Sequence, residues 1–338
     1  MNVSIIVLTY NSSEHLKQCI DSILKNMSSN DELIIIDNKS TDSTQKLLIQ
    51  YSKKCNVYFC NKNVGICEGR NLGAKLAKND VLAFVDSDIV LNNGALDYAK
   101  KSYIKNNVKA LVGSFAEYGE GYNWFVEMRR ELFSTKRKKN FNNKITLKNF
   151  TCFCGGLCFI EKLTFIKYGG YDITFSGYPS EDINLELLML RDNVNIIFEK
   201  NFRGNHLKSK MEFTSLSSKF KKNGIAISKL IKSSIKNNYK IPFNSGWPYL
   251  PYIAPLEILF LILSYMNPYF LFLSLLLIFP RIIIVFAKSE RKIIYNIKFI
   301  FVRFYLDIIM FISIIKGFIN SACNIDKLLD YQYKKIER

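Results

Sequence analysis

Residues 82 to 88, Leu82-Ala83-Phe84-Val85-Asp86-Ser87-Asp88, form an apolar run that leads directly into two carboxylates. The apolar part is typical of a buried strand, and ligands of open α/β sheets bind outside the carboxyl ends of the strands. Mg²⁺ is commonly held by one or two carboxylates together with substrate phosphates. The stretch therefore favours a metal and diphosphate site, although Asp is also common in the turns that follow strands.

The chain before this stretch alternates between strand and helix patterns. Short apolar runs at Val3 to Leu8, Glu32 to Ile36 and Val57 to Cys60 are separated by amphipathic segments. This βαβ rhythm predicts a parallel sheet with covering helices. The carboxyl ends of three strands then carry polar side chains at one sheet edge, namely Thr9, Tyr10 and Asn11, Asp37 and Asn38, and Asp86 to Asp88.

Five motifs in this order resemble those of the family 2 glycosyltransferases, which have the GT-A fold. They lie at residues 3–11, 36–42, 63–73, 86–88 and 169–185, the last ending in Ser180-Glu181-Asp182-Ile183-Asn184-Leu185. The resemblance covers roughly residues 1–225. It implies an inverting transfer of a sugar from a nucleotide-diphosphate donor, assisted by Mg²⁺ or Mn²⁺.

The donor site is expected at the strand ends. Charge grows on the diphosphate as the glycosidic bond breaks, and a metal neutralises it as a Lewis acid. The resemblance assigns Asp88 to the metal and Asp86 to the ribose or sugar of the donor. We predict that the remaining donor contacts come from Thr9, Tyr10, Asn11, Asp37, Asn38, Arg70 and Ser87. Many relatives carry Asp where this chain has Asn38, which leaves the nucleotide open.

The acceptor side is expected around the last motif. An attacking hydroxyl must lose its proton, and we predict Asp182 as the base; the alternative is that Glu181 and Asp182 only complement a helix dipole. Gly155, Gly156 and Glu181 are predicted to form the acceptor pocket. The resemblance adds His206 as a metal or diphosphate ligand, with a surface histidine as the alternative.

Composition gives the organisation. The 338 residues accommodate a catalytic domain over 1–235 and a membrane-associated helical region over 236–338. Eight cysteines lack a disulfide-like framework, which favours a reducing compartment. The net charge of +18 predicts an anionic membrane surface as partner, because no nucleic-acid recognition module is visible.

The C-terminal third is rich in apolar residues. Runs over 249–266 and 269–287 predict a transmembrane hairpin with basic flanks, which places the catalytic domain in the cytoplasm. The stretch 299–319 carries Arg303, Asp307 and Lys316, so we expect an interfacial helix, with a third span as the alternative. The alternative without a membrane is that the C-terminal third forms a buried helical core.

These patterns predict a membrane-anchored inverting glycosyltransferase that acts on a lipid-linked or membrane-proximal acceptor. A polyprenyl-phosphate glycosyl synthase, whose acceptor is the lipid phosphate itself, is one alternative. A catalytically silent membrane scaffold that binds nucleotide sugars is another.

Overall fold

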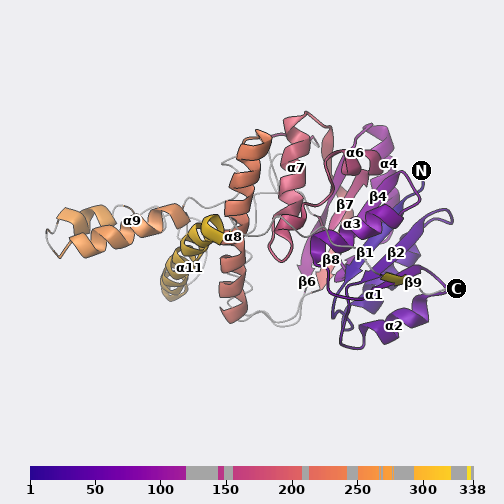
Figure 1. Cartoon of the computed structure of the whole chain (residues 1–338), viewed down its shortest axis with the longest axis horizontal. Helices are drawn as coiled ribbons and strands as arrows, with labels where there is room; N and C mark the ends of the chain where they lie inside the picture. Colours follow the sequence, from indigo (N-terminus) through magenta and orange to yellow (C-terminus); the bar gives the residue numbers. More distant parts are fainter. Residues whose placement is uncertain are drawn as a thin grey trace.

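The computed structural model describes residues 1–118, 144–147, 155–207, 213–241, 250–265, 267, 269–275, 277, 293–320 and 333–335. Within them, nine strands form one sheet in the order β5-β8-β6-β7-β4-β1-β2-β3-β9 (Figure 1). The strands are β1 (Ser4–Thr9), β2 (Glu32–Asp37), β3 (Asn56–Cys60), β4 (Val81–Val85), β5 (Ile89–Leu91), β6 (Ala110–Tyr118), β7 (Leu157–Glu161), β8 (Ile196–Leu207) and β9 (Tyr333–Lys335).

The parallel half of the sheet has the βαβ order that the sequence predicts. Strand β1 pairs in parallel with both β2 and β4, and β2 pairs in parallel with β3. Helices α1 (Leu16–Asn26), α2 (Thr44–Tyr51) and α3 (Ile66–Leu76) connect these strands, and α4 (Ala95–Lys105) follows β5. The strands are almost entirely buried, which agrees with their unbroken apolar runs.

The other half of the sheet is mixed. Strand β7 runs antiparallel to both β4 and β6, and the twelve-residue β8 runs parallel to β6 and antiparallel to β5. The sequence predicts only the start of β8, at Asn195 to Phe198. Its continuation to Leu207 matters for the site, because it brings His206 beside Ile89 on β5.

The helices of the second half extend away from the sheet. Helix α6 (Lys162–Lys167) follows β7, and α7 (Glu181–Arg191) precedes β8. In Figure 1, α8 (Phe213–Asn237) stands between α7 and α11 (Ile293–Asn320), and α9 (Leu250–Leu263) lies farthest from the sheet. A second apolar cluster joins α8 to α11 through Leu216, Phe220, Ile227, Leu306, Met310 and Ile314.

The predicted transmembrane hairpin is not supported. Helix α9 has fourteen residues, and no described helix has the length and apolar character needed to cross a bilayer. The chain does turn back after α9, since the rings of Phe260 and Phe270 stack at 6.0 Å and the Ser274 hydroxyl donates to the Glu257 carbonyl. Most of the second predicted run, from residue 278 to 287, lies outside the described residues, and so does the basic flank at 288–292. A further run of basic residues in the sequence, at 136–139, also lies outside them.

The last described strand returns to the sheet. Strand β9 forms the edge of the sheet and pairs antiparallel with β3, with Lys335 opposite Tyr58 and Tyr333 opposite Cys60. Lys334 and Lys335 both belong to this strand. Their pairing is a tertiary feature, because a three-residue strand has no periodic pattern that would identify it.

Candidate active site

The ends of β1 and β2 lie side by side. Thr9 is opposite Asp37 in the parallel ladder, and both are buried. Asp37 accepts hydrogen bonds from the Ser40 backbone and from Gln45 Nε2. The buried Thr9 Oγ1 has no hydrogen-bond partner among the residues that the structure describes. A buried hydroxyl without a partner is costly, which makes Thr9 a candidate for a ligand contact.

The loop after β1 is held by its neighbours. Asn11 adopts a φ of +50°, and its Oδ1 accepts a hydrogen bond from the Thr41 backbone at 2.7 Å. Asn tolerates this left-handed conformation better than most residues. Tyr10 beside it is exposed, and the hydroxyls of Ser12 and Ser87 lie 3.1 Å apart. The loops that follow β1 and β4 therefore meet at this edge.

Asn38 has an internal role. Its Oδ1 accepts from the Val64 backbone at 2.7 Å, and its Nδ2 donates to Asn63 Oδ1 at 3.0 Å. The amide is 4% exposed. It fixes the loop that leads into α3, so in this structure its hydrogen-bonding groups are directed to the protein.

Arg70 links the two acidic motifs. Its Nη2 donates to Asp86 Oδ1 at 2.6 Å and its Nη1 donates to Glu181 Oε1 at 2.9 Å. The guanidinium is buried and lies 5.3 Å from the centre of the Tyr171 ring. Such a planar fork can bind two carboxylates in a fixed arrangement. Arg70 therefore connects the end of β4 to the start of α7, although the sequence suggests a phosphate or base contact.

The glycine pair before β7 makes room for carboxylates. A Cβ atom on Gly156 would lie 2.0 Å from Asp86 Oδ2, and one on Gly155 would lie 2.9 Å from the Asp182 Cβ. The Gly155 backbone N–H also donates to Asp182 Oδ2 at 3.0 Å. The absence of side chains at these two positions therefore lets Asp86 and Asp182 approach the backbone closely.

The two acids that begin α7 have perturbed pKa values. Burial raises the pKa of Glu181 to about 7, the Asp182 charge adds to the rise, and Arg70 opposes it. Burial also raises the pKa of Asp182, against the Gly155 N–H and the Arg70 guanidinium. Glu181 is buried and Asp182 is partly exposed. Two neighbouring carboxyls with raised pKa values titrate as a pair, and the accessible one is suited to accept a proton.

Asp88 and His206 face each other across the β5 and β8 pairing. The Nε2 of His206 lies 3.4 Å from Asp88 Oδ2, and the Leu207 N–H donates to the Asp88 carbonyl at 2.7 Å. No cluster of three or more His, Cys, Asp or Glu side chains suited to a metal occurs in the described part of the chain. The Asp88 carboxylate fits Mg²⁺ or Mn²⁺ where diphosphate and water oxygens complete the shell, and the His206 imidazole lies next to it.

Asn71 and Tyr171 also contribute to the site, although the sequence motifs assign them no role. Asn71 Nδ2 donates to the Tyr171 carbonyl at 2.8 Å, and the Tyr171 N–H donates to Asn71 Oδ1 at 2.9 Å. The Tyr171 ring packs edge-on to Phe84 and beneath Arg70. Both residues lie inside predicted motifs, Asn71 in 63–73 and Tyr171 in 169–185. Their position next to Arg70 and Asp172 in the chain is the sequence signal that could have identified them.

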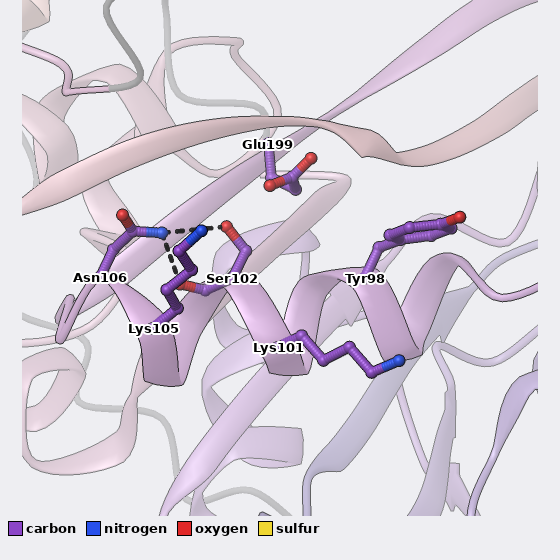
Figure 2. Close-up of a pocket in the computed structure, with 6 residues that line it drawn as sticks. All are labelled: Tyr98, Lys101, Ser102, Lys105, Asn106 and Glu199. Carbon is purple, nitrogen blue, oxygen red and sulfur yellow. Dashed lines mark hydrogen bonds between the residues drawn. The ribbon is translucent and has the colours of Figure 1, made fainter.

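A shallow groove elsewhere does not contain these residues. Tyr98, Lys101, Ser102, Lys105, Asn106 and Glu199 line it on α4 and β8 (Figure 2). Its polar side chains are mostly exposed, and the Asn106 amide is used in hydrogen bonds to Ser102 within the same helix. The acidic and basic side chains at the strand ends are the better candidate for chemistry.

Residues 4–169, just under half of the chain, match the family model described as Glycosyl transferase family 2. WfgD of Escherichia coli, a UDP-Glc:alpha-D-GlcNAc-diphosphoundecaprenol beta-1,3-glucosyltransferase, is 28% identical over 56% of this chain and 70% of its own length. TarP of Staphylococcus aureus, a poly(ribitol-phosphate) beta-N-acetylglucosaminyltransferase, is 36% identical over 35% of this chain and 38% of its own.

The chain spans less than half of several curated relatives, among them GlyG of Streptococcus pneumoniae, of which the match covers 40%. Among solved structures, the mannosyltransferase PcManGT from Pyrobaculum calidifontis, in complex with GDP-Man and Mn²⁺, aligns with a TM-score of 0.58. That alignment covers 94% of this chain and 87% of the other at 12% identity. It shows a GT-A-like α/β fold.

Proposed function

We propose that this chain is an inverting glycosyltransferase that moves a sugar from a nucleoside-diphosphate donor to a hydroxyl of a lipid-linked acceptor. The observation that carries the proposal is the Arg70 bridge. It joins Asp86, in the donor motif, to Glu181, which precedes the candidate base Asp182. Donor and acceptor chemistry would therefore meet at a single sheet edge.

The donor would occupy the strand ends. Thr9 and Asp37 lie at the ends of β1 and β2, and the orphaned Thr9 hydroxyl is a hydrogen-bonding group for base or ribose. Asp86 has a second carboxylate oxygen beyond the one that accepts from Arg70, which is suited to a sugar or ribose hydroxyl. Asn38 would act indirectly, by holding the loop before α3.

The metal-binding groups would be Asp88 and His206. A bound Mg²⁺ or Mn²⁺ would supply Lewis-acid stabilisation of the leaving diphosphate. The imidazole and carboxylate are already adjacent, with 3.4 Å between their nearest atoms. Their arrangement fits a cation that takes its remaining ligands from phosphate and water.

Asp182 would be the base of a single displacement. The acceptor oxygen would attack the anomeric carbon, its proton would pass to Asp182, and the bond to the diphosphate oxygen would break with inversion. The Gly155 N–H orients the Asp182 carboxylate, and its raised pKa makes it a better proton acceptor than an ordinary surface Asp. Glu181 would hold Arg70 in place.

The acceptor class rests on the relatives. WfgD is named for a diphosphoundecaprenol-linked acceptor and TarP for a poly(ribitol-phosphate) acceptor. Both are glycan carriers that contain phosphate, and the former is a lipid. A lipid-diphosphate-linked sugar is accordingly the acceptor that we propose for this chain.

The test begins with the donor. Purified full chain is screened against UDP, GDP, TDP and CDP, with and without Mn²⁺, by thermal shift or calorimetry. We expect one nucleotide to stabilise the protein only with metal, and Asp88→Ala to lose the effect. The corresponding nucleotide sugars are then offered with a diphosphoundecaprenol-linked sugar, and product is measured by mass spectrometry.

The base is tested with Asp182→Asn. This variant should keep the metal-dependent nucleotide shift while turnover falls by about 10²- to 10⁴-fold, because proton transfer from the acceptor is lost. Retained turnover would instead favour an acceptor that needs little deprotonation, as in a polyprenyl-phosphate synthase. Nucleotide binding without any transfer by the wild type would favour a silent scaffold.

A further inference from the structure

Helix α11 has large apolar side chains on the side that faces solvent. Phe301 and Ile319 are 69% and 68% exposed, and Tyr305, Ile312 and Ile315 lie between them at helical spacing. The opposite side of α11 packs on α8 through Leu306, Met310 and Ile314. A helix of an ordinary soluble domain buries its apolar stripe and exposes its polar one, so the outer side of α11 calls for a covering surface.

Three of the charged side chains within these apolar segments are turned inward. Arg303 Nε donates to both Asp307 oxygens, at 2.9 and 3.0 Å, and Asp307 is 0% exposed. The guanidinium of Arg303 lies 5.9 Å from the Phe220 ring centre on α8. Glu257 of α9 is also fully buried. The three charges therefore face the protein, which is the arrangement expected where the outside is apolar.

The apolar surface continues onto α9 and the segment that folds back on it. Leu256, Leu259, Leu261, Ile262, Tyr269, Leu271, Phe272 and Leu275 are all exposed. Helices α9 and α11 contact each other, so these side chains and those of α11 belong to neighbouring elements (Figure 1). We call this set, together with Phe301, Tyr305, Ile312, Ile315 and Ile319, the outer apolar surface.

The exposed charges on these helices have one sign. Helix α8 contains six lysines and no acidic residue, and Lys221, Lys222 and Lys236 are exposed. On α11, Lys316 is exposed beside Ile315. Across the described residues of α8, α9 and α11, every carboxylate is buried. An apolar surface accompanied by lysines is complementary to an anionic lipid headgroup layer.

We infer that the outer apolar surface binds an anionic lipid membrane. It would lie at the boundary between the acyl chains and the headgroups of one leaflet. The apolar side chains of α9 and α11 insert, and the lysines of α8 and α11 lie among anionic headgroups. The inward ion pair keeps the helix compatible with lipid on its outer side. This inference goes beyond the proposed function, because membrane binding requires none of the residues of the transfer site.

The experiment is flotation of the full chain with vesicles of phosphatidylglycerol and phosphatidylcholine in equal parts. We expect binding that weakens in pure phosphatidylcholine and in high salt. Phe301→Glu and Ile319→Glu should each lower vesicle affinity by at least about tenfold, since each places a carboxylate in the apolar layer. Lys221→Ala with Lys222→Ala should lower it by roughly thirtyfold, at about fivefold for each lysine.

Matched controls use equally exposed residues on the α/β domain. Leu163→Glu on α6 and the pair Lys25→Ala with Lys53→Ala should leave vesicle affinity unchanged. Urea unfolding checks that every variant is folded. Failure of the wild type to float, or equal loss in the controls, would overturn the inference. So would a dimer by light scattering that Phe301→Glu dissociates, because the surface would then be covered by a second copy.

The inference and the proposed function can fail separately. Asp182→Asn should float like the wild type while its turnover falls by about 10²- to 10⁴-fold. Phe301→Glu should retain the metal-dependent nucleotide shift while it loses vesicle binding.

Discussion

Arg70 is the residue on which the site geometry depends. Its two terminal nitrogens donate to two carboxylates from different parts of the chain. Glu181 lies 111 positions from Arg70 in the sequence, and Asp86 lies 16 positions from it. Removing one member of such a buried network leaves the others as poorly compensated charges. A lysine keeps the charge but has a single ammonium group, which does not reproduce the fork.

We therefore expect Arg70→Lys to lower the free energy of unfolding by about 2 kcal/mol, the size of a lost charge-assisted hydrogen bond. Turnover should fall as well, because Glu181 and Asp86 lose their common support. Urea denaturation and initial rates measure the two effects. The control is Arg191→Lys, whose partly exposed pair with Asp192 should matter by less than about 1 kcal/mol. Equal effects in the two variants would contradict the role of the bridge.

The raised pKa values of the α7 acids predict the pH dependence of transfer. A base works deprotonated, so a raised pKa makes activity disappear at a higher pH than for an ordinary carboxylate. Burial raises the pKa of the base Asp182, so kcat/KM should begin to fall at a higher pH than it would with an ordinary aspartate as the base.

Glu181→Gln should move this acid limb to lower pH, because the Asp182 carboxylate would no longer share its surroundings with a second negative charge. The measurement is kcat/KM against pH at constant ionic strength, with Glu199→Gln, a half-buried residue outside the site, as control. An acid limb at about 4 in the wild type, or one that Glu181→Gln leaves in place, would be inconsistent with the coupled pair.

At the scale of elements, the turn into β7 sets the distance between β4 and α7. The Asp86 N–H donates to the Gly156 carbonyl at 2.9 Å, and Gly155 donates to Asp182. Ser180, the residue before α7, adopts a φ of +89°, a strained conformation for a residue with a Cβ. Tight turns on both elements therefore bring their acidic side chains together.

Gly156→Ala should disturb the donor side of the site, since its Cβ would meet Asp86 Oδ2 at 2.0 Å. We expect turnover to fall about a hundredfold, the scale of a displacement near 1 Å, with weaker nucleotide binding. Gly94→Ala is the matched control. It strains a φ of +74° at the start of α4, with the nearest side-chain atom at 3.7 Å. It should cost roughly 1 kcal/mol of stability and leave turnover unchanged.

At the scale of the whole molecule, the C-terminal helices support the catalytic half. Asn184, two positions after Asp182, accepts hydrogen bonds from Ser233 on α8 at 2.6 Å and from Tyr239 at 2.8 Å. Helix α8 packs on α7 on one side and on α11 on the other (Figure 1). It ends at Asn237, so the predicted boundary at residue 235 falls inside its last turn.

We expect Tyr239→Phe to lower stability by about 1 kcal/mol and to speed amide exchange in α7, because Asn184 Oδ1 loses the buried hydroxyl that donates to it. Hydrogen exchange with mass spectrometry of the segment 181–191 measures this. Tyr168→Phe removes a hydroxyl that bonds the exposed Asp192, and it should change neither quantity. Unchanged exchange in Tyr239→Phe would mean that α8 does not support α7.

The parallel half of the sheet and the polar strand ends at Thr9, Asp37 and Asp86 could be predicted from the amino-acid pattern. Those features rest on local periodicity and on strand ends that share an edge. Tertiary structure decided what the side chains do. Arg70 reaches Glu181 and Asn38 holds Val64 only because distant segments pack together. Likewise, the charged residues of 299–319 indicate that the helix has a polar side. Only its packing on α8 decides that Asp307 faces inward and Phe301 outward.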